Sequence, residues 1–241
     1  MIANARARFG STNFGAVTRA KVLSLLMTRF LDVRADSRTD DAGAASHALG
    51  MVPTGEFSRI VMSHALKLHP DSRCTAVTHI DVAVARAHGQ LTLTYLVTGK
   101  IGDLRLAPPG ARARADGLWQ HTCFEAFVRR APSPRYYELN FAPSTQWAAY
   151  RFRGYREGLV VVEDMAPPHI ESRPGAESYS LEAVLKLDAL PSLPADVAWR
   201  LNLSAVIEEV DGRKSYWALA HTPGKPDFHH ADNFVLELPA T

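Results

Sequence analysis

The sequence predicts an all-β protein, an antiparallel β-sandwich or jelly roll. After residue 62, apolar side chains recur at every second position in many short stretches, which is the period of half-buried strands. Gly, Pro, Asn and Asp turn signals separate most of these stretches. Long amphipathic helical patterns are hard to find, and no βαβ rhythm is visible, so a parallel sheet is not expected.

The candidate strands follow one another along the chain. AVTHIDVAVARA (76–87) places Ile80, Val82 and Val84 on one side, and LTLTYLV (91–97) returns after a turn, which predicts a hairpin. The Asp211-Gly212 pair predicts a second tight hairpin. The remaining candidate strands are TCFEAFVR, YYELNFA, WAAYRF, YSLEAVLKL, WRLNLSAVIEEV, SYWALAH and FVLEL.

Two segments are candidates for short helices. MSHALKL (62–68) is compatible with one helical turn. LDALPSLPADV (187–197) is compatible with a short helix limited by its prolines.

The chain is expected to consist of an extension, residues 1–61, and one domain, residues 62–241. Residues 1–31 contain Arg and Lys but no Asp or Glu, a composition found in organellar transit peptides. An upstream extension with no role in the fold, and an internal start at Met62, is the simpler interpretation. Residues 32–56 are rich in Ser, Ala, Gly and Asp and predict a linker or disorder.

Composition excludes several functional classes. Hydrophobic residues make up 46% and charged residues 22% of the 241 residues, as in a soluble globular protein. The net charge of +2 gives no argument for nucleic acid, and no apolar run approaches the roughly 20 residues that span a bilayer. Cys74 and Cys123 imply no disulfide framework. Without a convincing signal the expected location is cytoplasmic; no cofactor is expected, and a protein partner is unknown.

One predicted sheet face is unusually polar. If Phe124, Ala126 and Val128 face the core, their neighbours point the other way. The same alternation in the next strands gives a polar set: Glu125, Glu138, Asn140, Asn202 and Ser204. A solvated outer surface is one interpretation, and a ligand platform accompanied by Trp119, Tyr136 and Trp147 is the other.

These residues resemble a known family. The segments GLWQHTCFEAFV, NFAPSTQWAAYRF, IEEVDGRKSYWALAH and PDFHHADNF, within residues 64–241, are similar to bacterial DOMON-like domains and remotely to family 9 carbohydrate-binding modules. The resemblance implies a jelly roll that holds a sugar between two aromatic rings beside a carboxylate. Trp119 and Phe228 match the rings and Glu125 matches the carboxylate, with Asn140, Glu138 and His229 as further candidates.

A sugar site like that of the family 9 modules would require a particular local structure, and this chain departs from their pattern at two positions. Six extended residues would separate Trp119 from Glu125 by roughly 20 Å, so GLWQHT must fold back over the sheet. The sugar binders carry an arginine where this chain has Glu138, and an Asp of theirs is missing near LVTGK.

Three other functions remain open. A hydrolase could use Glu125 and Glu138 as its carboxylate pair. An interaction domain could present the aromatic loops to another protein. Zinc could bind a set of histidines, although their spacing matches no known metal motif; these are His121, His221, His229 and His230. Haem ligation would have to involve Met165, and nothing else in the sequence favours it.

Overall fold

The computed structural model describes residues 61–87, 89–186, 190, 193–194 and 196–240. The chain divides into two compact units, residues 1–55 and 56–241, and only the second contains described residues. The predicted extension therefore lies outside the described residues except for Val61, and its structure stays a prediction. Most of the candidate helix at 187–197 also lies outside them.

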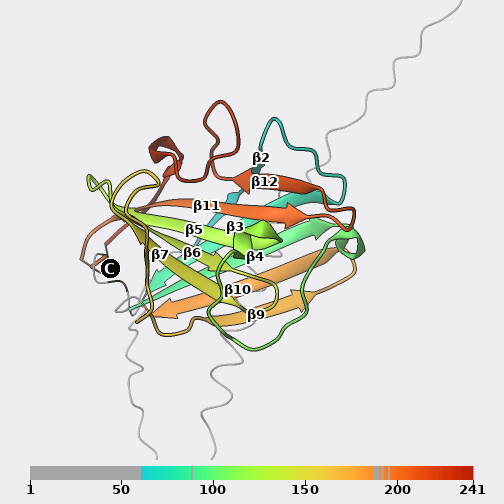
Figure 1. Ribbon diagram of the computed structural model, residues 1–241, viewed down its shortest axis with the longest axis horizontal. Coiled ribbons are helices and arrows are strands. Elements are labelled where there is room, and N and C mark those ends of the chain that lie inside the picture. Colours follow the sequence, from blue (N-terminus) through green and yellow to red (C-terminus); the bar gives the residue numbers. More distant parts are fainter. Residues whose placement is uncertain (1–60, 88, 187–189, 191–192, 195, 241) are drawn as a thin grey trace, which may run out of the picture. The chain divides into compact units, whose positions relative to one another are not determined.

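Within the described residues the strands form two antiparallel sheets, which confirms the predicted β-sandwich (Figure 1). The smaller sheet has the order β1-β3-β4-β10-β9. Its strands are β1 (Val61–Ala65), β3 (Val77–Ala87), β4 (Gln90–Gly99), β9 (His169–Pro174) and β10 (Ser178–Lys186). The predicted hairpin is β3–β4, whose register runs from Val77 opposite Gly99 to Ala87 opposite Gln90.

The larger sheet has the order β2-β12-β11-β5-β6-β7-β8, and β13 pairs with β11. Its strands are β2 (Lys67–Leu68), β5 (Cys123–Arg130), β6 (Tyr136–Phe141), β7 (Trp147–Phe152), β8 (Val160–Val161), β11 (Trp199–Glu208), β12 (Lys214–Ala218) and β13 (Leu236–Leu238). The hairpin predicted at Asp211-Gly212 joins β11 to β12, and Gly212 has a φ of 86° there. That left-handed conformation suits glycine, which lacks the Cβ that would strain it.

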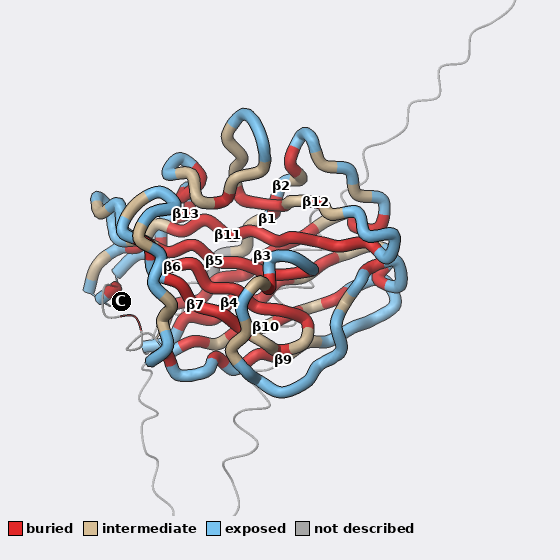
Figure 2. The backbone as a smooth tube through the Cα atoms, viewed as in Figure 1, coloured by how far each residue is buried: buried red, intermediate tan, exposed pale blue. Residues whose placement is uncertain are grey.

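The main core lies between the two sheets. Phe124, Ala126 and Val128 of β5 face it, as the alternation predicted, together with alternate residues of the other strands. The central strands are buried along most of their length, whereas the connecting loops carry most of the exposed residues (Figure 2). A hydrogen bond ties the sheets together: the hydroxyl of buried Tyr95 on β4 donates to the backbone carbonyl of Glu125 at 2.7 Å.

Some sequence interpretations are corrected. MSHALKL forms β1 and β2 and not a helical turn, because β1 pairs residue for residue with β3, from Val61 opposite Ala85 to Ala65 opposite Asp81. Such tertiary pairing overrides weak local preferences. Trp147 faces the core between the sheets and not the polar face. Strands β8 and β9 escaped prediction, since β8 has two residues and β9 is a polar edge strand ending at Pro174.

The described residues contain no α-helix, only short 3₁₀ turns: η1 (Ile101–Asp103), η2 (Leu118–Gln120) and η4 (Ala231–Asn233). Accordingly, no helix in this part of the chain has the length and apolar character to span a membrane.

We expect Tyr95→Phe to lower the free energy of unfolding by about 1–2 kcal/mol, because it removes a buried hydrogen bond between the sheets. Urea unfolding followed by circular dichroism measures the change. The matched control is Tyr216→Phe, since Tyr216 is only partly buried and its loss should be below about 0.5 kcal/mol. Equal losses in the two variants would contradict the structural role given to the Tyr95 hydroxyl.

Candidate functional site

Three neighbouring strands of the larger sheet carry the polar residues on the face turned away from the main core. We call this set the polar face: Glu125 on β5, Glu138 and Asn140 on β6, and Asn202 and Ser204 on β11. Glu125 lies directly opposite Ser204 on one side and Asn140 on the other. Phe127 lies in the same way between Asn202 and Glu138. The sequence therefore placed these five residues together correctly.

The polar face is buried, so its interpretation as a solvated sheet surface is wrong. Glu125 is 2% exposed and Glu138 6%, while Asn140, Asn202 and Ser204 are fully buried. A second apolar cluster surrounds them and includes Phe127, Tyr136, Tyr150 and Phe228. Because an unpaired buried charge is costly, buried carboxylates call for a structural or functional reason.

Hydrogen bonds within the polar face are few. The Asn140 amide Nδ2 donates to Glu138 Oε1 at 2.9 Å, and the Ser204 hydroxyl donates to Glu125 Oε2 at 3.3 Å. The Asn202 Nδ2 donates to the backbone carbonyl of Phe228 at 2.9 Å. This last bond holds the segment around Phe228 against the sheet.

Burial changes the acidity of both carboxyl groups. Desolvation, with the nearby Glu138 charge as a second cause, raises the pKa of Glu125 well above its ordinary value. Desolvation also raises the pKa of Glu138, although the hydrogen bond from Asn140 and the positive charge of Arg156 oppose that change. Two neighbouring carboxyl groups with raised pKa values hold protons more readily than solvated ones.

The segment before β5 folds back over the sheet, as a site containing Trp119 and Glu125 requires. Gly117 has a φ of 73°, and Leu118–Gln120 form the 3₁₀ turn η2. Leu118 packs into the apolar cluster beside the polar face. Trp119 is 43% exposed and meets the ring of Tyr150 edge-on at 5.9 Å between centroids. Tyr150 was not among the predicted site residues.

The loop between β12 and β13, residues 219–235, covers the polar face, and we call it the covering loop. The ring of Phe228 is 8% exposed, and its centroid lies 6.4 Å from that of the Phe127 ring, so the ring is packed in this structure. The ring of His229 lies 5.0 Å from Phe127, and its Nδ1 is 2.8 Å from the Tyr136 hydroxyl. Burial lowers the pKa of His229 to about 4, so this imidazole is neutral at pH 7.

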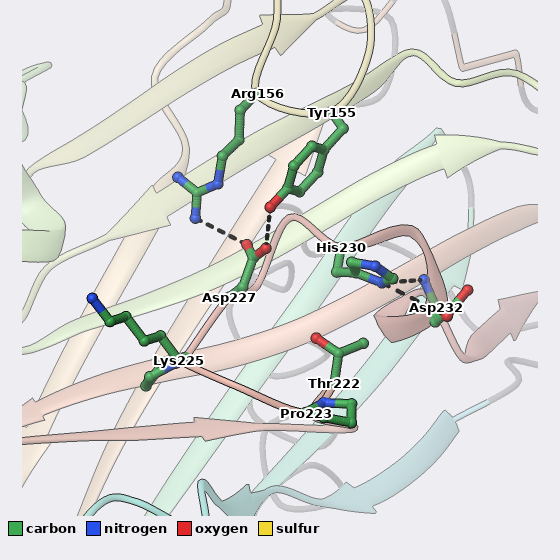
Figure 3. A pocket seen from close by; sticks show the side chains of 9 residues that line it. Tyr155, Arg156, Thr222, Pro223, Lys225, Asp227, His230 and Asp232 are labelled. Atoms are coloured by element: carbon green, nitrogen blue, oxygen red, sulfur yellow. Dashed lines mark hydrogen bonds and ion pairs between the residues drawn. The ribbon is translucent and has the colours of Figure 1, made fainter.

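Asp227 fastens the covering loop to the turn after β7 (Figure 3). Its carboxylate accepts from the Tyr155 hydroxyl at 2.5 Å, from Arg156 Nη2 at 2.9 Å and from the backbone N–H of His229 at 3.0 Å. These groups border an open cavity of about 610 Å³, which Lys225 and His230 also line. Sequence reasoning missed this contact, because Tyr155 and Asp227 are 72 residues apart.

The four histidines considered for zinc have separate partners. His121 Nδ1 is 2.7 Å from Glu208 Oε2, His221 Nε2 is 2.8 Å from the Lys67 carbonyl, and His230 Nδ1 accepts from the Asp232 N–H at 3.3 Å. Across the described ranges, no group of three or more His, Cys, Asp or Glu side chains is arranged to hold a metal ion. Met165, considered for haem, is packed in the main core.

The comparisons with known proteins show that this chain is similar in fold to solved structures. No family model matches the chain, and no curated protein matches it. The structure of a proposed carbohydrate-binding protein from Bacteroides uniformis ATCC 8492 matches with a TM-score of 0.55 and 16% identity, over 72% of this chain and 84% of that one. Two structures of a family 9 carbohydrate-binding module from Caldicellulosiruptor kristjanssonii, with cellotriose and with glucose, match at 12% identity with TM-scores of 0.41 and 0.40. They cover 68% and 66% of this chain, and 75% and 76% of their own.

We expect the stability of Glu125→Gln relative to the unmodified protein to increase as the pH rises above 4.5, the ordinary pKa of the group. A carboxyl whose pKa is raised by folding contributes stability below its ordinary pKa, and that contribution is lost as pH rises through the raised value. Glutamine has no such dependence. Urea unfolding between pH 4 and 8 measures the difference. Glu163→Gln makes the same replacement at an exposed position and is the control. A flat difference for Glu125→Gln would refute the raised pKa.

We expect Asp227→Ala to increase amide hydrogen exchange in residues 227–233, because it releases the covering loop from Tyr155 and Arg156 and removes the acceptor of the His229 N–H. Hydrogen–deuterium exchange with mass spectrometry measures the change. Asp164→Ala, at an exposed loop position, serves as control. Unchanged exchange in the Asp227 variant would show that the packing of Phe228 and His229 alone holds the loop.

Proposed function

We propose that this protein is a non-catalytic binding protein for a carbohydrate or a similar small polar ligand, and that the polar face and the rings around it form the site. The observation that carries the proposal is the burial of two carboxylates and two amides on a sheet face next to a partly exposed tryptophan. Sugars present apolar C–H faces that stack on aromatic rings and hydroxyl groups that carboxylates fix. The polar face and Trp119 offer both kinds of contact.

The roles follow from where each residue lies. Trp119, the most exposed ring of the site, is assigned the stacking role, and Tyr150 supports it from the side. Glu125, Glu138 and Asn140 are assigned the hydroxyl contacts. Phe228 and His229 belong to the covering loop, so their contact with a ligand would require that loop to move.

The family assignment is part of the same proposal. We place the chain among the DOMON-like domains on its sequence segments, with family 9 carbohydrate-binding modules as remote relatives. The Bacteroides uniformis protein, which shares the fold, is itself proposed to bind carbohydrate. That description supports a sugar ligand here without identifying the sugar.

A hydrolase is the second candidate, and the raised pKa of Glu125 beside Glu138 is the observation in its favour. A carboxyl group whose pKa is raised is better suited to act as a general acid than an ordinary one. However, the two carboxyl groups are nearly inaccessible, which suits cleavage of a long glycan chain less well than retention of a small ligand. Release of reducing sugar from a glycoside panel would favour the hydrolase.

We expect the full-length protein to change its tryptophan fluorescence saturably with at least one member of a panel of mono- and disaccharides. Trp119→Ala should lose roughly tenfold or more in affinity, because the ring supplies the stacking surface. Isothermal titration calorimetry measures the affinity of the variant, which lacks the reporter ring. Trp217→Phe, at a ring that faces the main core, is the control. Silence across the panel by both methods would refute sugar binding.

A further inference from the structure

Each side-chain amide of the polar face, like its one hydroxyl group, already donates one hydrogen bond. One amide N–H of Asn140 donates to Glu138, one of Asn202 donates to the Phe228 carbonyl, and the Ser204 hydroxyl donates to Glu125.

The polar face also presents buried acceptors that have no donor in the described part of the chain. The partners of the two amides, a carboxylate and a carbonyl, accept hydrogen bonds, so each amide presents its nitrogen to the partner and its oxygen elsewhere. The Oδ1 atoms of Asn140 and Asn202 are buried and have no hydrogen-bond partner among the described residues. A buried acceptor without a donor is costly, and a bound ligand is one way to supply that donor.

Neither carboxyl group of the polar face is paired with a cation among the described residues. Arg156, the cation that influences Glu138, directs its guanidinium to Asp227 at 2.9 Å. His229 Nε2 is 3.7 Å from Glu138 Oε2, beyond hydrogen-bond distance. The Tyr136 hydroxyl accepts a hydrogen bond from the backbone N–H of Arg156 and can donate its own hydrogen to His229 Nδ1. The His229 ring that accepts this hydrogen bond is neutral. No full positive charge in the described structure contacts either carboxyl group.

We propose that the ligand of this site carries a primary ammonium group, as an amino sugar does, and that the ammonium binds among Glu125, Glu138 and Asn140. Asn140 lies opposite Glu125 in register and donates a hydrogen bond to Glu138. The residue with the unpaired Oδ1 is therefore a neighbour of both carboxyl groups. An ammonium supplies three donors and no acceptor, whereas a hydroxyl brings lone pairs toward groups that already accept. The inference rests on the proposed function and specifies its ligand class.

Calorimetric titration of the full-length protein at pH 7 with D-glucosamine, D-glucose and N-acetyl-D-glucosamine tests the proposal. Glucosamine should bind at least about tenfold more tightly than either neutral sugar, because charge-assisted hydrogen bonds are roughly twice as strong as neutral ones. N-acetyl-D-glucosamine is the matched ligand, since it keeps the nitrogen and lacks the charge.

A variant pair locates the effect. Glu138→Gln retains an acceptor for Asn140 but removes the charge, so the preference for glucosamine over glucose should fall to below about threefold. Glu163→Gln removes an exposed carboxylate from a loop and should keep the full preference. If Glu138→Gln fails to fold, the three sugars compared on the unmodified protein still decide the outcome.

The outcomes separate this inference from the proposed function. Equal affinities for glucosamine and glucose would refute the proposal that the ligand carries an ammonium group, but would not contradict carbohydrate binding. A full glucosamine preference in folded Glu138→Gln would overturn the placement among these carboxyl groups. Binding of none of the three sugars, together with silence across the wider sugar panel, would overturn both.

Discussion

The alternation of side chains along β5 is the constraint on which both the core and the candidate site depend. Phe124, Ala126 and Val128 enter the core, and this requires Glu125 and Phe127 to occupy the opposite face. A shift of one residue would exchange the two sets and place a carboxyl group between the sheets. The hydrogen bond from Tyr95 to the backbone of Glu125 fixes this strand against the smaller sheet at that residue.

Two buried carboxyl groups on a sheet face work against stability. Removing a charged carboxylate from water is costly unless partners compensate, and the polar face supplies only a few partners. The apolar cluster around it offsets part of this cost, because Phe127, Tyr136 and Phe228 bury large rings there. Such a local conflict between solvation and burial is commonly found where a protein binds or reacts.

The sequence predicted the sandwich and the composition of the polar face well, because a period of two determines which side chains share a face. It could not predict whether that face was covered, since solvated and covered faces show the same alternation. Trp147 was assigned to the wrong face, because the sequence of β7 did not show which of its alternate side chains face the core. The contact between Asp227 and Tyr155 joins two loops that are distant in the sequence, and no local pattern in either loop predicts it. The ring-stacking role predicted for Phe228 also depends on where a loop lies, and no observation tests it.

If the polar face binds a ligand as we propose, the contacts that hold the covering loop affect the rate of binding as well as its strength. Because Glu125 is 2% exposed, a ligand that binds there as proposed would reach the carboxyl group only after a covering segment moves. Association would then proceed through a sparsely populated open form, and its observed rate would level off at the opening rate as ligand concentration rises. Apparent affinity would be reduced in proportion to the open fraction. Substitutions at Tyr155 or Arg156, in the turn that holds Asp227, could thus alter affinity by shifting this equilibrium.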